Sequence, residues 1–381
     1  MAQPSHRFAA LDSWRGICAL SVVLFHLNAG VHFHEQLNNG YVAVDFFFVL
    51  SGFVIGSAYL DRIGDLGDLA RFSLRRVGRL YPLHLAVLLV YLGLELGRVA
   101  LGSPHTFTGE RTWPAFFADL FLLQGFNGWD LTWNMPAWSI SIELWTNLAF
   151  AVLALAVGRR LPWVAAAFAA VMTVLLALTP EVPSPFSEKE VDILNGAFQC
   201  VMEFFLGVAG FSLFTWLRGL GLKPPGWLEF PAVIAAVLTF AFIGELPGLA
   251  PGYIFFAVVM IFAFEAGPVA RALKRPWPLR LGEISYSIYL SHSLYTLAGF
   301  MLVKTAGVRL GLPWLEESEG RDLLVLGGPW VMDAVALACL VCVVVSSNLT
   351  YRFIEDPARI AFNRLSTRIA PRKARSLETA A

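Results

Sequence analysis

The sequence carries little charge for its length. Only 15% of its 381 residues are charged, whereas 57% are hydrophobic, and the mean hydropathy is +0.64. A water-soluble chain of this size needs more charged surface, so the composition predicts that lipid is its solvent. The chain also lacks an internal repeat of the kind found in secondary transporters, and it lacks low-complexity tracts. A soluble globular protein is excluded, and a transporter built from inverted repeats is disfavoured.

Cysteine is scarce as well. The four cysteines lie in apolar stretches, where cysteine usually serves as a small buried hydrophobe. Cys339 and Cys342 have CxxC spacing, but their surroundings are apolar and lack the second ligand pair of a zinc site. We therefore predict no metal site. The N-terminal segment has no small-residue cleavage signal, so the first apolar stretch is predicted to be retained.

What the chain has is a series of long apolar stretches. A helix needs roughly 20 largely apolar residues to cross a bilayer. The hydropathy pattern predicts an all-α polytopic membrane protein with about ten transmembrane helices. One stretch near residues 113–126 is too short to cross and is predicted to be a re-entrant or interfacial helix. The predicted spans are 17–31, 42–60, 81–101, 137–157, 161–178, 193–217, 228–243, 253–266, 281–303 and 330–349.

Lysine and arginine are concentrated in alternate loops. If the N-terminus is cytoplasmic, most of the 28 basic residues fall in inner loops or in the C-terminal tail. An even number of spans returns the C-terminus to the side of the N-terminus. We therefore predict that both termini are cytoplasmic, with a transmembrane domain over residues 1–357 and a basic cytoplasmic tail over residues 358–381.

Polar side chains at membrane depth are costly, so each is a candidate for function. Arg15 and His26 are eleven residues apart. On an α-helix this separation places the two side chains within about 20° of the same face and roughly 16 Å apart along the axis. With Arg15 at the inner surface, His26 is predicted about halfway through the bilayer. Histidine can act as a general base near neutral pH, and arginine can bind phosphate or a carbonyl oxygen. A histidine that serves only in packing is the alternative.

The second and third spans add further candidates. Asp45 lies near the outer end of the second span, and Ser51-Gly52 forms a small pair at its middle, which close helix packing alone also explains. Arg76 and Arg79 are three residues apart and form a fork of donors suited to phosphate oxygens. Arginines beside lipid headgroups are the alternative for that fork.

The fourth and ninth spans contain two more polar clusters. Glu143 lies within apolar sequence, preceded by Trp138 and Ser139, which is a setting for a proton carrier or a sugar-binding carboxylate. In the ninth span Tyr286, Tyr289 and His292 recur every three residues, so one helix side carries them all. Polar groups that only pack between helices are the alternative in both places.

Taken together, these runs resemble the acyltransferase 3 family of bacterial membrane O-acyltransferases, which modify surface polysaccharides and some small glycosides. The resemblance spans almost the whole chain in family order. It rests on Arg15 with His26, Phe47 to Ile55 around Ser51-Gly52, Arg76 with Arg79, Trp138-Ser139 with Glu143, Ser285-Tyr286 with Tyr289 and His292, and Glu355-Asp356-Pro357. It implies a location in the bacterial cytoplasmic (inner) membrane, an acyl-CoA donor, usually acetyl-CoA, bound from the cytoplasm, and an acceptor hydroxyl on the other side.

The resemblance and the pattern of polar residues assign expected roles. His26 takes the essential catalytic role, with Arg15 as its partner and Glu143 as a group that orients the histidine or grips the acceptor. Acyl-CoA is expected to bind at Arg75, Arg76, Arg79 and Tyr81, and the site-lining or acceptor-binding residues are expected to be Asp45, Ser51, Gly52, Trp138, Ser139, Tyr286, Tyr289 and His292.

The expected reaction moves an acyl group, an acetyl group above all, from acyl-CoA to a hydroxyl of a glycan or glycoside. His26 either deprotonates the acceptor for direct attack or is itself transiently acylated. The rival hypothesis is a transporter or exporter of a glycan or glycolipid in which the same polar groups line a pathway. We expect no permanently bound cofactor and no nucleic-acid partner. The lipid bilayer is the expected surrounding, and a homodimer is left open.

Overall fold

The computed structural model describes residues 7–109, 111–126, 133–178, 193–242, 248–318 and 321–369. The described chain is mostly helical, and six of its helical stretches are long and apolar enough to cross a membrane. A helix lies at each predicted span, although the count of ten crossings remains a prediction. These helices are α1 (Ala9–Leu27), α3 (Ala43–Tyr59), α4 (Leu66–Ala100), α6 (Ala137–Val157), α7 (Leu161–Leu178), α8 (Ile193–Gly219), α9 (Glu229–Phe242), α10 (Ala250–Ala263), α13 (Ser285–Leu310) and α14 (Pro329–Thr350).

Shorter elements connect and flank these helices. The stretch predicted to be re-entrant or interfacial contains one short helix, α5, within residues 113–126. After α14 the chain continues through a π-helical turn, Tyr351–Glu355, directly into α15. The short elements are α2 (His34–Leu37), α5 (Trp113–Leu120), α11 (Pro268–Leu273), α12 (Pro276–Glu283), α15 (Asp356–Ile369), β1 (Leu315–Ser318) and β2 (Arg321–Leu324).

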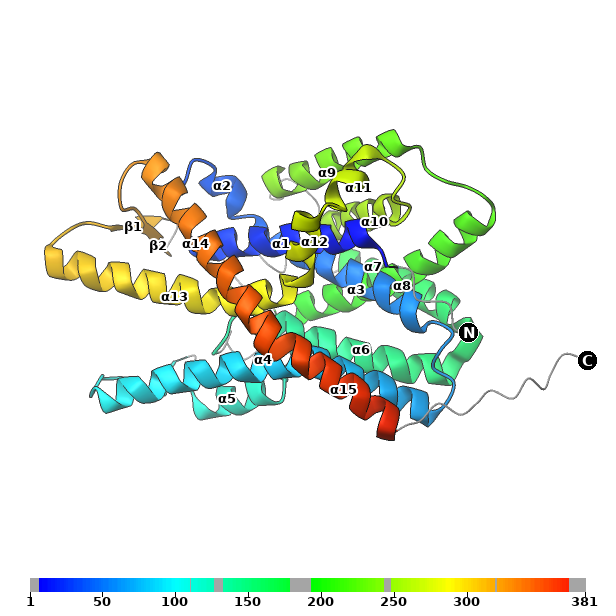
Figure 1. Cartoon of the computed structure of the whole chain (residues 1–381), viewed down its shortest axis with the longest axis horizontal. Coiled ribbons are helices and arrows are strands. Elements are labelled where there is room, and N and C mark those ends of the chain that lie inside the picture. Colours follow the sequence, from blue (N-terminus) through cyan, green and yellow to red (C-terminus); the bar gives the residue numbers. More distant parts are fainter. Residues whose placement is uncertain are drawn as a thin grey trace, which may run out of the picture.

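Most of the long helices share one direction, and α14 and α15 cross it (Figure 1). Figure 1 shows α1, α3, α4, α6 and α13 running roughly along the long axis of the molecule, while α14 and α15 cross them diagonally as one continuous rod. The ends of α13 and α4 opposite to α15 extend beyond the other helices. In the described part of the chain, one end of the helix bundle is covered by α15 and the other carries the β1–β2 hairpin (Figure 1).

Close helix crossings depend on glycine. A Cβ atom at Gly52 on α3 would overlap the backbone carbonyl of Phe204 on α8, and one at Gly207 on α8 would overlap the carbonyl of Val49. Small residues allow helix backbones to approach in this way inside membranes. Gly52 therefore lies at the α3–α8 crossing, where it allows the close helix packing that was predicted as the alternative to a role in the site.

The first helix differs from its predicted bounds. It begins at Ala9 rather than Ile17 and ends at Leu27 rather than Val31, because Asn28 has a left-handed backbone conformation with φ 44°. Its polar first turns are helical because they pack on α12, where a Cβ atom at Gly16 would lie 2.6 Å from the Leu281 carbonyl carbon. His26 therefore lies in the last turn of α1.

A β-hairpin departs from the predicted all-α architecture. In it β1 and β2 pair antiparallel, with Leu315 opposite Leu324. The Leu324 amide donates to the Asn28 carbonyl at 3.1 Å, and the Gly30 amide donates to the Leu324 carbonyl at 3.0 Å. The hairpin therefore holds the segment that directly follows His26. Hydropathy analysis did not find it, because short strands in a connecting loop leave no long apolar stretch.

Candidate active site

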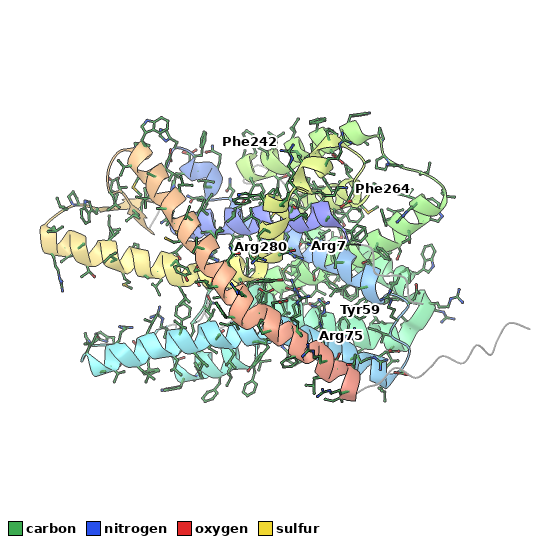
Figure 2. All side chains as sticks on the ribbon, viewed as in Figure 1. Arg7, Tyr59, Arg75, Phe242, Phe264 and Arg280 are labelled. Carbon is green, nitrogen blue, oxygen red and sulfur yellow. The ribbon has the colours of Figure 1, made fainter. Side chains whose placement is uncertain are left out.

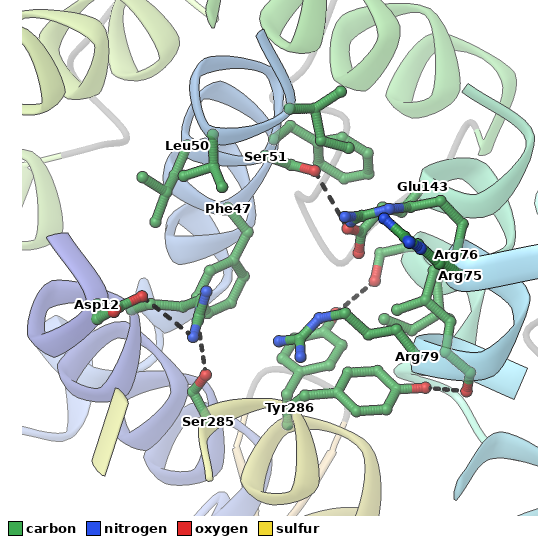
Figure 3. Close-up of a pocket in the computed structure, with 18 of the residues that line it drawn as sticks. Asp12, Phe47, Leu50, Ser51, Arg75, Arg76, Arg79, Glu143, Ser285 and Tyr286 are labelled. Atoms are coloured by element: carbon green, nitrogen blue, oxygen red, sulfur yellow. Dashed lines mark hydrogen bonds and ion pairs between the residues drawn. The ribbon is translucent and has the colours of Figure 1, made fainter. Parts of the chain in front are cut away.

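A cavity of about 570 Å³ is enclosed by side chains from α1, α3, α4, α6, α13 and α15. Among the described residues, its lining includes five arginines but only two carboxylate side chains, Asp12 and Glu143. Figure 3 shows Asp12 and Ser285 on one side of the cavity, and three arginines on the opposite side. The arginines are Arg15, Arg75, Arg76, Arg79 and Arg359. Such an excess of guanidinium groups suits an anionic ligand, and phosphate in particular.

Arg15 is fixed at one wall by α13 and the residues before it. Its Nε donates to the Ser285 hydroxyl at 2.8 Å, and its terminal amino group donates to the Gly282 carbonyl at 2.8 Å. Asp12, one turn earlier on α1, forms an ion pair with Arg15 at 3.5 Å. Because these bonds define the guanidinium plane, the charge of Arg15 is pre-organised for a ligand in the cavity.

The opposite wall is the fork on α4. Arg79 lies 3.7 Å from the buried Glu355 carboxylate, and Arg75 donates from Nε to the Ser366 hydroxyl at 3.0 Å. The guanidinium carbon of Arg76 lies 5.9 Å from the ring centre of Tyr59. Its Nε is buried without a hydrogen-bond partner among the described residues. A buried donor without a partner costs about 1–3 kcal/mol, and a bound anion would remove that cost.

Glu143 and its neighbours form the inner part of the cavity. The Ser51 hydroxyl donates to the Glu143 carboxylate at 3.1 Å, which joins α3 to α6. The hydroxyls of Ser139 and Tyr289 lie 2.7 Å apart and join α6 to α13. Tyr286 donates its hydroxyl proton to the Leu80 carbonyl. The structure thus brings Ser51, Ser139, Glu143, Tyr286 and Tyr289 to one cavity with the arginines.

The two histidines form a pair of their own, outside the lining of this cavity. His292 Nε2 lies 3.2 Å from His26 Nδ1, and the ring centres are 4.8 Å apart. His292 Nδ1 faces the Tyr289 carbonyl at 2.6 Å, and His26 Nδ1 faces the Val22 carbonyl at 2.9 Å. A carbonyl oxygen only accepts, so both Nδ1 atoms carry the proton in the neutral rings. That assignment leaves His26 Nε2 as the basic nitrogen of its ring.

The helix α13 links the cavity to the histidine pair. Ser285, Tyr286 and Tyr289 line the cavity, and His292 follows Tyr289 by one turn. Arg15 and His26, predicted to share one face of α1, both contact α13, through Ser285 and His292 respectively. The predicted common face is confirmed by these two contacts.

Besides the two histidines, four predicted site residues lie outside the cavity lining. The buried Asp45 faces α8, where Gln199 donates to it at 2.6 Å and also donates to Glu203 at 3.1 Å. Tyr81 donates its hydroxyl proton to the Leu120 carbonyl beside α5. Gly52 lies at the α3–α8 crossing, and Trp138 is half-buried against the core. Their predicted roles in ligand binding stay predictions.

Other residues of the site were missing from the predicted set. Asp12 and Phe47 line the cavity, and so do Arg359 and Asn363 from α15. The sequence signal for the last two was their spacing of four residues, which places them on one helix face. Both residues fall in the stretch predicted to be a basic cytoplasmic tail, 358–381, so the cavity wall built by α15 was not anticipated.

The fold and the site define a helical membrane protein with a strongly basic cavity next to a histidine pair. A family model described as an acyltransferase domain matches residues 8–349. The chain therefore belongs to the acyltransferase 3 family, and it is an enzyme, an acyltransferase. This membership favours the enzyme over the transporter that the sequence left open.

Three relatives illustrate the similarity. Acyltransferase MdmB of Streptomyces mycarofaciens is 28% identical over 92% of this chain and 91% of its own length. Protein 2 in picA locus of Rhizobium radiobacter is 34% identical over 43% of this chain and 97% of its own length. Putative peptidoglycan O-acetyltransferase YrhL of Bacillus subtilis is 27% identical over 96% of this chain, which spans 57% of that relative. No solved structure matches the chain.

Proposed function

We propose that this enzyme is a membrane O-acyltransferase that moves an acetyl group from acetyl-CoA to a hydroxyl of a glycan or glycoside. The observation that carries the proposal is the cavity with five arginines beside the His26–His292 pair. Arginines bind phosphates such as those of coenzyme A, and a histidine can act as the general base that removes a hydroxyl proton. The choice of an acetyl group and of a glycan acceptor is supported by the relative named as a putative peptidoglycan O-acetyltransferase.

The proposal includes an orientation. The chain crosses the bacterial inner membrane ten times, with both termini and the arginine cavity on the cytoplasmic side, where acyl-CoA is made. The acceptor reaches the histidine pair from the opposite side, near the hairpin that holds Asn28 and Gly30. The concentration of arginine around α15 and the start of α4 supports this orientation.

The orientation is tested by labelling. In a background without the four native cysteines, a cysteine is introduced at either His105 or Arg368, and intact cells are treated with a membrane-impermeant maleimide. His105 follows α4 and Arg368 lies in α15, and both are exposed. We expect labelling at position 105 in intact cells and labelling at position 368 only after lysis. The reverse pattern would contradict the orientation.

The chemistry assigns each group a task. The arginines bind the phosphates of the donor, and the thioester end of the pantetheine arm extends along α13 toward the histidines. His26 Nε2 takes the proton from the acceptor hydroxyl, the oxygen attacks the thioester carbonyl, and the C–S bond breaks to release the thiolate of coenzyme A. The proton on His26 then passes to the thiolate or to water. His292 accepts a hydrogen bond from His26 Nδ1 and so holds the ring in the basic tautomer.

The activity is tested with radiolabelled acetyl-CoA and purified protein in lipid nanodiscs, with a panel of glycosides as acceptors. We expect transfer of label to an acceptor, with no label on the protein when acceptor is absent. Label retained on a histidine would replace direct transfer by an acyl-enzyme route. Absence of both transfer and thioester hydrolysis with every acceptor would contradict the proposed function. Mass spectrometry of surface glycans from hosts with and without the protein would identify the acceptor.

A further inference from the structure

Two further hollows adjoin the arginine cavity beneath α15. One, of about 480 Å³, is lined by Arg75, Ile360, Asn363, Arg364 and Thr367. The other, of about 400 Å³, is lined by Ala58, Tyr59, Arg62, Asp68, Arg71, Arg75 and Thr367. Arg75 belongs to the lining of all three spaces, and Figure 2 shows it close to Tyr59 at this end of the molecule. The cavity and the two hollows therefore all border Arg75, and together they are called the basic path.

The helix α15 is held over this path by packing against α4 and by a hydrogen bond. A Cβ atom at Gly78 on α4 would overlap the Phe362 side chain, so the two helices are in direct contact there. One turn away, the Ser366 hydroxyl accepts from Arg75 Nε at 3.0 Å. Because α15 continues from α14 without a loop, its N-terminal end is fixed as well. It also lies beyond the residues that the family model matches.

The path is basic along its length. Arg62 and Arg364 are exposed and line one hollow each, and Arg75 borders both hollows and the main cavity. Arg71 forms an ion pair with Asp68, which is the only carboxylate that the described part of the chain adds to the lining of either hollow. A ligand that follows this path therefore meets positive charge outside the main cavity as well as inside it.

The negative charge of coenzyme A lies at one end of the molecule, where it can meet arginines both inside and outside the main cavity. Its pantetheine arm is nearly neutral, whereas its nucleotide end carries a diphosphate and a 3′-phosphate. The main cavity has the volume of an ordinary small-molecule site, and coenzyme A is longer than the ligands that such sites enclose. The nucleotide end therefore needs a second, basic space that borders the first.

We propose that α15 and the first turns of α4 form a subsite for the nucleotide end of the donor, in which Arg364, Arg62 and Arg75 bind its 3′-phosphate, while the other arginines of the main cavity bind its diphosphate. This subsite rests on the proposed function, because it assumes an acyl-CoA donor. Asn363 lies at the junction, since it lines both the main cavity and the hollow with Arg364. The C-terminal helix is thus part of the donor site, and Ser366 positions Arg75 within it.

The test compares two exposed arginines on the same helix. Arg364 lines the hollow, and Arg368 follows it on α15 without lining either space. We expect Arg364→Gln to raise the KM for acetyl-CoA about tenfold, as for the loss of one charge-assisted hydrogen bond. The KM for acetyl-4′-phosphopantetheine, which lacks the nucleotide, should not change. Arg368→Gln should change neither value, and Ser366→Ala should act in the direction of Arg364→Gln.

A binding measurement makes the subsite testable apart from turnover. Adenosine 3′,5′-bisphosphate is titrated into the purified protein and its two glutamine variants, with adenosine as the uncharged control. We expect binding of the bisphosphate that Arg364→Gln weakens about tenfold and Arg368→Gln leaves unchanged. Equal affinity in all three proteins would overturn the subsite. So would a rise of the KM for both donors together.

The same variants separate a nucleotide from a lipid headgroup. If the arginines of α15 bind lipid phosphates, Arg364→Gln and Arg368→Gln should reduce the retention of anionic lipid by the purified protein equally and leave the KM for acetyl-CoA unaltered, which would overturn the subsite. If bisphosphate binds as expected but no donor is turned over, the proposed function fails while a binding site for nucleotide phosphates at Arg364 stands. Failure of one is thereby distinguishable from failure of the other.

Discussion

The arginine cavity and the histidine pair lie along the same helix, α13, but different kinds of group hold them in place. The cavity arginines are held by side chains and carbonyls from several elements, among them Ser285, Glu355 and Ser366. The histidines are held by each other and by the carbonyls of Val22 and Tyr289, each on the same helix as its histidine. The first region provides excess positive charge, whereas the second fixes the protonation of a base.

Because of this difference, substitutions in the two regions should affect different kinetic parameters. Removing an arginine takes away part of the attraction for an anionic donor, so its effect should appear in KM. Removing a histidine alters the group that transfers a proton, so its effect should appear in kcat while donor binding is retained. Each substitution below tests whether binding and reaction are separated in this way.

The largest effect is expected for His26→Ala. Loss of the base should lower kcat by about 10²–10⁴-fold, the usual contribution of general-base catalysis, while the affinity for coenzyme A stays within about twofold. Initial rates and a binding titration measure the two quantities. His105→Asn is the matched control, because His105 is exposed and asparagine tolerates its φ of 59°. Full activity of His26→Ala at normal membrane abundance would refute the catalytic role.

A smaller effect, on KM rather than on kcat, is expected for Arg76→Gln. The cavity loses a guanidinium whose buried Nε has no partner among the described residues, so the KM for acetyl-CoA should rise about tenfold or more with little change in kcat. Arg218→Gln, an exposed arginine at the end of α8, is the control. A fall in kcat at unchanged KM would show that the two regions are not separable.

His292→Gln should have a moderate effect. One hydrogen bond to His26 is lost or weakened, and such a bond contributes about 0.5–1.5 kcal/mol, so kcat should fall up to about tenfold. The KM for acetyl-CoA should remain unchanged, because His292 does not line the cavity. Steady-state kinetics in nanodiscs give both values. A loss as large as that of His26→Ala would instead make His292 a second proton-transfer group.

The smallest effect is expected for Asp45→Asn. The buried carboxylate faces Gln199 and Glu203 on α8, and the amide oxygen of asparagine can still accept from Gln199. Both kcat and KM should therefore stay within about twofold of the unsubstituted enzyme. Purified yield and the midpoint of thermal unfolding serve as checks on folding. A selective loss of acceptor use, at normal stability, would return Asp45 to the reacting site.

Several elements were predictable because their signals are local. The bounds of α6 and α7 match the predicted spans, since their apolar runs begin and end at clear breaks in hydropathy. The common face of Arg15 and His26 follows from helix geometry alone. Wherever a property depends on residues within one helix, the order of amino acids is sufficient to predict it.

Contacts between helices were not predictable in the same way. Nothing in the run around Asp45 indicates that it faces α8 rather than the cavity, and nothing near Tyr81 indicates its bond to Leu120. The hairpin beside His26 and the cover formed by α15 depend on pairing between segments far apart in the chain.

The membrane character, the positions of the apolar helices and the presence of a histidine and an arginine fork all follow from the order of amino acids alone. Tertiary structure alone decided which polar groups share a cavity, because helix rotation and crossing set the direction of each side chain. It placed Arg359 and Asn363 of α15 beside the fork and joined His26 to His292. Residues 266 positions apart in the chain become neighbours only when α1 and α13 pack together.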